Sequence, residues 1–123
     1  EDTPVGNVNG LMAMNTAFMK KNPGIANKIV KAFTESTRYY ASNSKAMIQG
    51  ARNLTGASIG ILEEGMKHAS LENRMFLTNA KTLAKLAFEG GIVKKNVASA
   101  VGGWMNYQFL MNATGKSKAD LGG

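Results

Sequence analysis

The amino-acid sequence predicts a mainly α-helical chain of five or six helices with one short N-terminal strand. Two observations carry this fold class. Apolar residues recur at steps of three and four over most of the chain, which is the spacing of one helix face. A single segment, residues 9–14, is short, apolar and strand-like. The 123 residues then form one segment, with the strand at 9–14, helices over 16–111 and a frayed polar tail at 112–123.

The first elements are predicted around Asn22-Pro23. Residues 16–21 form one amphipathic turn, and a long helix follows it. Asn22 is expected to cap this helix with its side chain, and Pro23 suits the first helical position, where a missing N–H is harmless. We expect the inward face of the helix to consist of Ile25, Ile29, Val30, Phe33, Thr37 and Tyr40.

Four further helices are predicted after a break at 42–44, over residues 45–54, 58–69, 74–89 and 96–110. Gly56 is expected to end the first of them in the left-handed conformation, and Gly90-Gly91 to end the third. Asn96 is the predicted cap of the last helix. Gly102-Gly103 lies inside that helix at a cost of ~1 kcal/mol per glycine relative to alanine, which favours a kink or close packing.

The predicted strand has no partner in the sequence. A lone strand cannot satisfy its own backbone N–H and C=O groups. We therefore expect the chain to be a fragment of a larger protein, or to pair with a copy of itself through that strand. The start at Glu1-Asp2-Thr3-Pro4, without an initiator Met or a basic-then-apolar leader, agrees with a processed terminus or a cut inside a longer protein.

The composition excludes several classes of function. Hydrophobic residues make up 44% and charged residues 19%, a globular rather than a disordered composition. Cysteine is absent, which excludes disulfides, thiolate catalysis and cysteine metal sites. No apolar run approaches the ~20 residues that a membrane-spanning helix needs.

The net charge of +7 raises the question of nucleic-acid binding. The basic residues are spaced singly or in pairs, with no run of four. Only three of the 15 are Arg, the side chain best suited to forked phosphate contacts. We therefore favour a solvated basic surface over a nucleic-acid interface.

The sequence holds no catalytic or metal-binding set. His68 is the one histidine, and Glu63-Glu64, being adjacent, point to different sides of a helix. We expect no enzymatic activity, no metal and no cofactor. The methionines on predicted inward stripes and the two aromatic clusters are expected to pack in the core: Met12, Met47, Met66, Met105, Tyr39-Tyr40 and Trp104 to Tyr107.

An ordered set of short motifs resembles the C-terminal part of the substrate-binding proteins of ABC importers, most closely the nitrate/sulfonate/taurine and thiamine-precursor group. An apolar strand is followed by an "F-x-K-x-N-P" turn, a helix with "v-K-A-f/y-x-E-a-x", an "N/S-x-N"-like break and a late "l-x-x-x-G-x-I-x-K". The matching segments are 10–15, 17–23, 30–37, 40–46 and 86–94. The resemblance covers about residues 9 to 95 in the same order.

The resemblance implies a two-lobed α/β receptor of the type II periplasmic-binding-protein fold, of which this chain would be a C-terminal fragment. Such a receptor closes on a small ligand, here anionic or sulfonate-like, and delivers it to a membrane permease. It implies a periplasmic or extracellular location, lipid-anchored or soluble. Carried over by position, Asn7, Asn9 and Gly10 lie nearest the ligand cleft, where asparagine amides would hydrogen-bond the ligand.

A different class of function stays open. The chain would then be a stand-alone basic helical module that binds nucleic acid or a protein partner. This alternative predicts binding to DNA or RNA that weakens steeply with salt, because neutralised phosphates release counterions.

Overall fold

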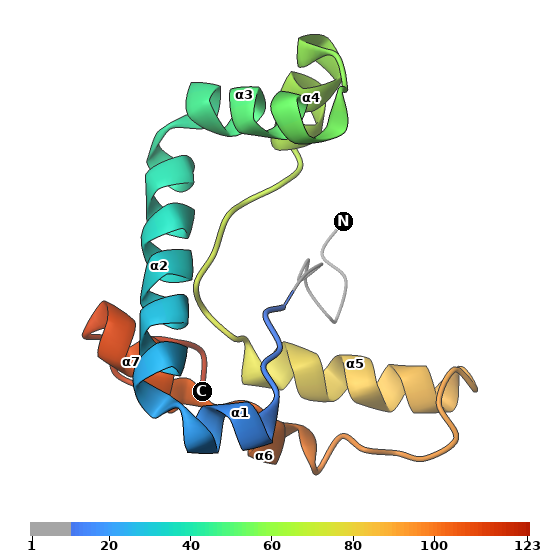
Figure 1. Ribbon diagram of the computed structural model, residues 1–123. Coiled ribbons are helices and arrows are strands. Elements are labelled where there is room, and N and C mark those ends of the chain that lie inside the picture. The colour runs from blue at the N-terminus through green and yellow to red at the C-terminus, as the bar shows by residue number, and fades with distance from the viewer. Residues whose placement is uncertain (1–10) are drawn as a thin grey trace.

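The computed structural model describes residues 11–123, and in this part of the chain it contains seven helices. They are α1 (Thr16–Lys21), α2 (Pro23–Ser42), α3 (Ser44–Thr55), α4 (Ile59–Met66), α5 (Leu77–Glu89), α6 (Val101–Trp104) and α7 (Tyr107–Thr114). Figure 1 shows α2 as a column with α3 and α4 at one end and the other helices around its opposite end. The mainly α prediction is confirmed.

The strand predicted at 9–14 is not found where the structure can be described. Residues 11–15 have no regular structure, and residues 11–123 contain no β-strand; the first two residues of the predicted strand lie outside the described part. A strand needs a neighbour to receive its backbone hydrogen bonds, and residues 11–123 provide none. The apolar pattern of this segment was therefore insufficient for a strand.

The α1–α2 junction confirms the role of Pro23 and corrects that of Asn22. Pro23 occupies the first turn of α2, but the side chain of Asn22 does not cap this helix. Its amide instead donates to the carbonyl of Phe18 at 3.3 Å, at the end of α1. The side-chain N-cap of this region is at the start of α1, where Oδ1 of Asn15 accepts the N–H of Phe18 at 3.0 Å. The side chain of Asn22 thus closes α1, while its backbone carbonyl accepts the N–H groups of Ile25 and Ala26 and opens α2.

Helix α2 packs mainly on α7, through a face that the sequence predicted only in part. The buried residues of α2 are Ala26, Val30 and Thr34. Val30 belongs to the central cluster, together with Tyr107, Leu110 and Leu121. The stripe one residue earlier, Ile25, Ile29 and Phe33, is 51%, 42% and 53% exposed. Because neighbouring helix residues lie about 100° apart, the buried face is rotated away from the most apolar one.

Helices α3 and α4 form a hairpin that extends from the end of α2 (Figure 1). Gly56 ends α3 with φ of 73°, as predicted, and its N–H donates to the carbonyl of Arg52 at 2.8 Å. The hairpin packs on α2 only through α3. Leu54 at its bend is 88% exposed.

The helix predicted over 96–110 is two short helices. Val101–Trp104 and Tyr107–Thr114 are separated by Met105 and Asn106, both in extended conformations. Asn106 accepts the N–H of Gln108 at 3.1 Å and so begins α7. The kink expected at Gly102-Gly103 is therefore a full break just beyond it, and Asn96 starts a turn rather than a helix.

The tail predicted as frayed is part of the core, and this is the largest error of the sequence-based prediction. Leu121 is 1% exposed and belongs to the central cluster. The N–H groups of Met75 and Leu77 donate to the carbonyls of Leu121 and Gly122, at 2.9 and 2.8 Å. These bonds, with Phe76 between them in the left-handed conformation at φ of 46°, keep the segment out of a helix, so that α5 begins at Leu77 and not at the predicted Arg74.

Candidate functional site: a basic cleft beside α2

The residues that the sequence analysis assigned to ligand binding, Asn7, Asn9 and Gly10, lie outside the described residues. The assignment stays a prediction. A candidate site within residues 11–123 has to come from the clefts and charges of that part of the chain.

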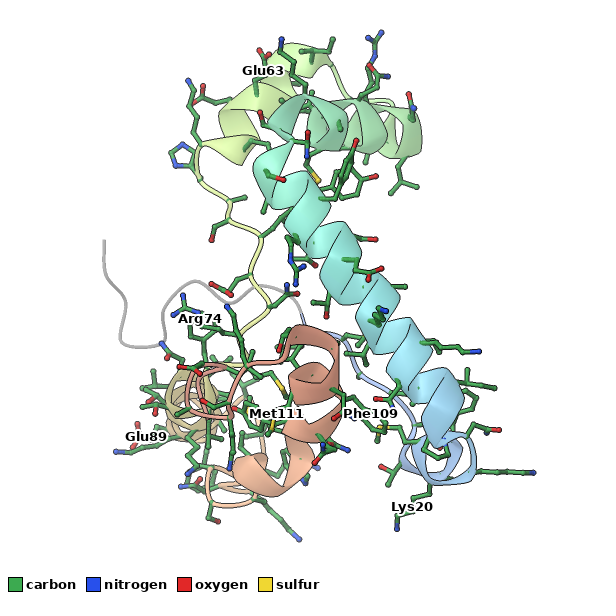
Figure 2. All side chains as sticks on the ribbon, turned by 90° about the vertical axis from the view of Figure 1, so that its left-hand side faces the viewer. Lys20, Glu63, Arg74, Glu89, Phe109 and Met111 are labelled. Atoms are coloured by element: carbon green, nitrogen blue, oxygen red, sulfur yellow. The ribbon has the colours of Figure 1, made fainter. Side chains whose placement is uncertain are left out.

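One cleft lies between the C-terminal half of α2, the connection from α4 to α5, and the end of the chain. Its volume is about 190 Å³. The polar residues used below are Thr37, Arg38, Glu72, Arg74, Thr114 and Lys116, and we call this site the Arg38 cleft. Figure 1 shows the connection returning along α2, and Figure 2 shows Arg74 where that connection reaches the other helices.

Arg74 is held in place from two sides. Its guanidinium lies 2.8 Å from a carboxylate oxygen of Glu72. The same group lies over the ring of Phe76, 4.7 Å from its centre. The other Glu72 oxygen accepts the N–H of Asn73 at 2.8 Å and that of Arg74 at 3.1 Å. This carboxylate thus makes contacts with both of its oxygens, and two contacts orient the half-exposed side chain of Arg74.

These contacts lower the pKa of Glu72. Partial burial acts to raise it, but the hydrogen bonds from Arg74 and Asn73 and the charge of Arg74 outweigh this effect, so the pKa lies below its ordinary value of 4.5. Glu72 is therefore a carboxylate at neutral pH.

The other two cations of the Arg38 cleft lack such partners. Neither Arg38 nor Lys116 forms an ion pair with a carboxylate of residues 11–123, but Lys116 lies near Asp120, whose pKa is lowered by hydrogen bonds from Ser117 and by the charge of Lys116. The backbone N–H of Lys116 donates to the hydroxyl of Thr114 at 3.2 Å, which fixes the chain where Lys116 leaves α7. Three cations and one carboxylate give the cleft a formal charge of +2.

A second cleft, of about 220 Å³, lies between the first half of α2 and α7. Its polar groups are largely occupied with each other. The amide of Asn112 donates to Oδ1 of Asn27 at 3.0 Å, and Lys31 lies 3.9 Å from Glu35. Lys28 is the remaining cation of its lining. This cleft offers less free polar chemistry than the Arg38 cleft.

The residues that the sequence analysis considered and rejected for catalysis, His68 and Glu63-Glu64, lie on the exposed surface in and after α4. His68 is exposed at the end of α4, and its Nε2 lies 3.7 Å from Glu64. Within residues 11–123 no three His, Cys, Asp or Glu side chains are grouped as a metal site would need. None of the described helices combines the length and apolar character needed to cross a membrane.

The predicted core role of the methionines and aromatic residues is confirmed in part. Tyr107 is buried and Met105 packs against the central cluster, but Met12 is 42% and Trp104 66% exposed. Met14, Met75 and Met111 pack there as well, which the sequence analysis missed. Figure 2 shows Phe109 and Met111 on different sides of α7.

The sequence analysis also missed the Arg38 cleft. Its charged residues lie between positions 38 and 116, in three separate segments. No local motif connects them. The only signal in the sequence is that each of the three segments carries an isolated basic residue. Many exposed segments of a protein carry one, so this signal does not single out the cleft.

Comparison of the chain with models of protein families, with curated proteins and with solved structures gave no match.

Proposed function

We propose that this chain is the C-terminal helical part of the solute-binding component of an ABC-type import system. The complete receptor binds a small anionic or sulfonate-like ligand in the periplasm or outside the cell and delivers it to a membrane permease. It is not an enzyme. Asn7, Asn9 and Gly10 lie at the ligand cleft in this proposal. The ordered motifs between residues 9 and 95 are its basis.

One structural observation supports the proposal most directly: α2 has two apolar stripes. Ala26, Val30 and Thr34 are buried within this chain. Ile25, Ile29 and Phe33 repeat at the same four-residue spacing and are about half exposed. The two stripes lie about 100° apart and together make one broad apolar face, of which only one edge is covered within residues 11–123. A further layer of structure would cover the other edge. In a two-lobed α/β receptor the second layer is a sheet.

The exposed area of the chain agrees with a missing layer. The chain exposes 8977 Å². A compact monomer of 13.1 kDa exposes about 6,400 Å². Large apolar side chains contribute to this excess on three helices that surround the central cluster: Phe18, Ile25, Ile29, Phe33, Leu83, Leu86 and Phe88. Covering them by a further part of the same protein would lower this exposed area.

The test is ligand binding by the complete natural polypeptide that contains this chain. We would titrate it with taurine, an alkanesulfonate, nitrate and a thiamine-precursor pyrimidine, using calorimetry. One of these is expected to bind, and Asn9→Ala is expected to weaken it by about tenfold, the value of one lost hydrogen bond to a charged group. Asn53→Ala, an exposed asparagine on α3, is the matched control.

The alternative function predicts a different result. If none of the four ligands binds and the protein binds DNA with an affinity that falls steeply between 50 mM and 200 mM salt, as about six phosphate contacts would require, the importer proposal is wrong. A stand-alone basic helical module would then be the better description.

A further inference from the structure

We propose that the Arg38 cleft binds a small organic anion, whose carboxylate or phosphate head lies between Arg38 and Lys116 and whose apolar part contacts Leu71 and Ala41. The proposal does not rest on the importer function, because the cleft contains neither Asn7, Asn9 nor Gly10.

The positive charge of the cleft favours an anionic ligand. Arg38, Arg74 and Lys116 reach it from three segments, and only Arg74 is neutralised, by Glu72 at 2.8 Å. A guanidinium presents a planar fork of N–H donors that fits carboxylate and phosphate oxygens. The hydroxyl of Thr37 lines the same space and can donate to the same oxygens, whereas that of Thr114 already donates to the carbonyl of Leu110 at 2.7 Å. The site thus combines two cations that form no ion pair with one neutral donor.

The cleft is built before any ligand arrives. Arg74 is fixed by Glu72 and by the ring of Phe76. Leu121, which lines the cleft, is 1% exposed and is anchored by the hydrogen bond from Met75 to its carbonyl at 2.9 Å. An ordered wall reduces the entropy lost on binding. Only the two exposed cations, Arg38 and Lys116, have to be ordered by the ligand.

The residues that line the cleft also indicate that the ligand is small and that the part beside its anionic head is apolar. At about 190 Å³ the cleft is smaller than the roughly 300–1,000 Å³ of drug-sized pockets. Leu71 and Ala41 add apolar surface beside the cations, whereas Leu121, at 1% exposed, adds almost none. Burying a short alkyl group there tightens binding by up to about fourfold for each CH₂. An organic anion with a few carbons therefore fits better than an inorganic one.

The experiment titrates the full 123-residue chain with butyl phosphate, inorganic phosphate and butan-1-ol, followed by amide NMR shifts and calorimetry. Butyl phosphate is expected to bind more tightly than inorganic phosphate, and butan-1-ol not to bind. The largest shifts are expected at Thr37, Asn73 and Lys116. If the shifts are spread over the basic residues of all helices, or if inorganic phosphate binds as tightly as butyl phosphate, the proposal is wrong.

Two pairs of variants separate this cleft from the general positive charge of the chain. Arg38→Gln is expected to weaken butyl phosphate binding by about tenfold or more, as for a lost hydrogen bond to a charged group. Arg52→Gln, on the exposed surface of α3, removes the same charge and is expected to leave binding unchanged. Equal weakening by both variants would overturn the proposal. Circular dichroism of both variants shows that the helices are retained.

The second pair of variants tests for an increase in affinity for butyl phosphate instead of a loss. Glu72→Gln removes the one carboxylate of the cleft and releases Arg74, so we expect binding about two- to fivefold tighter, the effect of one exposed ion pair. Glu89→Gln changes the net charge equally at the exposed end of α5 and is expected to have no effect. Weaker binding by Glu72→Gln would contradict the assignment of the anion to this cleft.

Discussion

The hydroxyl of Tyr107 donates a hydrogen bond to the carbonyl of Gly122 at 3.2 Å. This bond connects the first residue of α7 to the end of the chain. The ammonium of Lys118 lies over the same ring, 5.3 Å from its centre. Burial raises the pKa of Tyr107, so the hydroxyl keeps its proton and remains a donor at neutral pH. The relationship explains how a tail without secondary structure forms part of the core.

The first prediction removes this hydrogen bond alone. Tyr107→Phe keeps the buried ring and removes one of the two hydrogen bonds that the Gly122 carbonyl accepts, while the bond from the N–H of Leu77 at 2.8 Å remains. We expect the free energy of unfolding to fall by about 0.5–1.5 kcal/mol, measured by urea denaturation. Tyr39→Phe, at a residue that is 55% exposed, is the control and is expected to change nothing. Equal effects of the two variants would show that the tail is not held by Tyr107.

The second prediction concerns two glycines for which the same substitution has opposite effects. Gly122 has a φ of +81°, and a Cβ there would lie 2.9 Å from the backbone nitrogen of Phe76. Gly122→Ala is expected to destabilise the chain by at least about 1–2 kcal/mol. Gly60 lies inside α4 with nothing within 4 Å of an added Cβ. Gly60→Ala is expected to stabilise the chain by about 0.5–1 kcal/mol. Thermal denaturation of both variants checks the reversal of sign.

The third prediction follows from a buried hydroxyl on α2. Thr34 is 1% exposed, and its Oγ1 has no hydrogen-bond partner among residues 11–123. Thr34→Val has nearly the same shape and removes the unpaired group, so we expect it to stabilise the chain by about 1–3 kcal/mol. Thr37→Val, at a less buried position one turn later, is the comparison and is expected to have a smaller effect. A destabilised Thr34→Val variant would contradict the burial of an unpaired hydroxyl.

The fourth prediction is a pH dependence that comes from Glu72. Its pKa in the folded chain lies below the ordinary value of 4.5. Its contribution to stability is therefore complete above about pH 4.5 and is lost as the pH falls through the lower pKa of the folded chain. Since the pair with Arg74 is partly exposed, we expect this contribution to be only about 0.2–1 kcal/mol.

The measurement compares the urea midpoints of the parent chain and Glu72→Gln between neutral pH and pH 3. The difference between them is expected to be constant at neutral pH and to shrink below about pH 4.5. Glu89→Gln controls for the net charge. A difference that grows as the pH falls would contradict the direction of the pKa shift.

The fifth prediction separates the two apolar stripes of α2. Val30→Ala removes buried methyl groups from the central cluster and is expected to cost about 1.5–3 kcal/mol. Phe33→Ser, at a side chain that is 53% exposed, is expected to cost less than about 1 kcal/mol in the 123-residue chain. Sedimentation of the parent chain accompanies this measurement. If Phe33→Ser costs as much as Val30→Ala, a second copy covers the exposed stripe in solution.

Local signals predicted the element boundaries that depend on a few neighbouring residues. Pro23 begins α2, Gly56 ends α3 and α5 ends at Glu89 before Gly90, as expected. These signals act through backbone groups three or four residues apart, which the sequence displays directly. Asn22 is the exception, because it lies between the end of α1 and the start of α2. The sequence does not show with which of the two its side-chain amide forms a hydrogen bond.

The sequence by itself determined that this chain is helical and where most of its helices begin and end. The tertiary structure decided which stripe of α2 is buried, that the last helix is divided at Met105, and that Leu121 enters the core. It also brought Arg38, Glu72, Arg74 and Lys116 to one cleft. The spacing of apolar residues shows which helix faces are able to be buried. It does not show which of them is buried, because the segment that covers a face comes from a distant part of the chain. Burial is therefore decided by packing between distant segments, which no local pattern records.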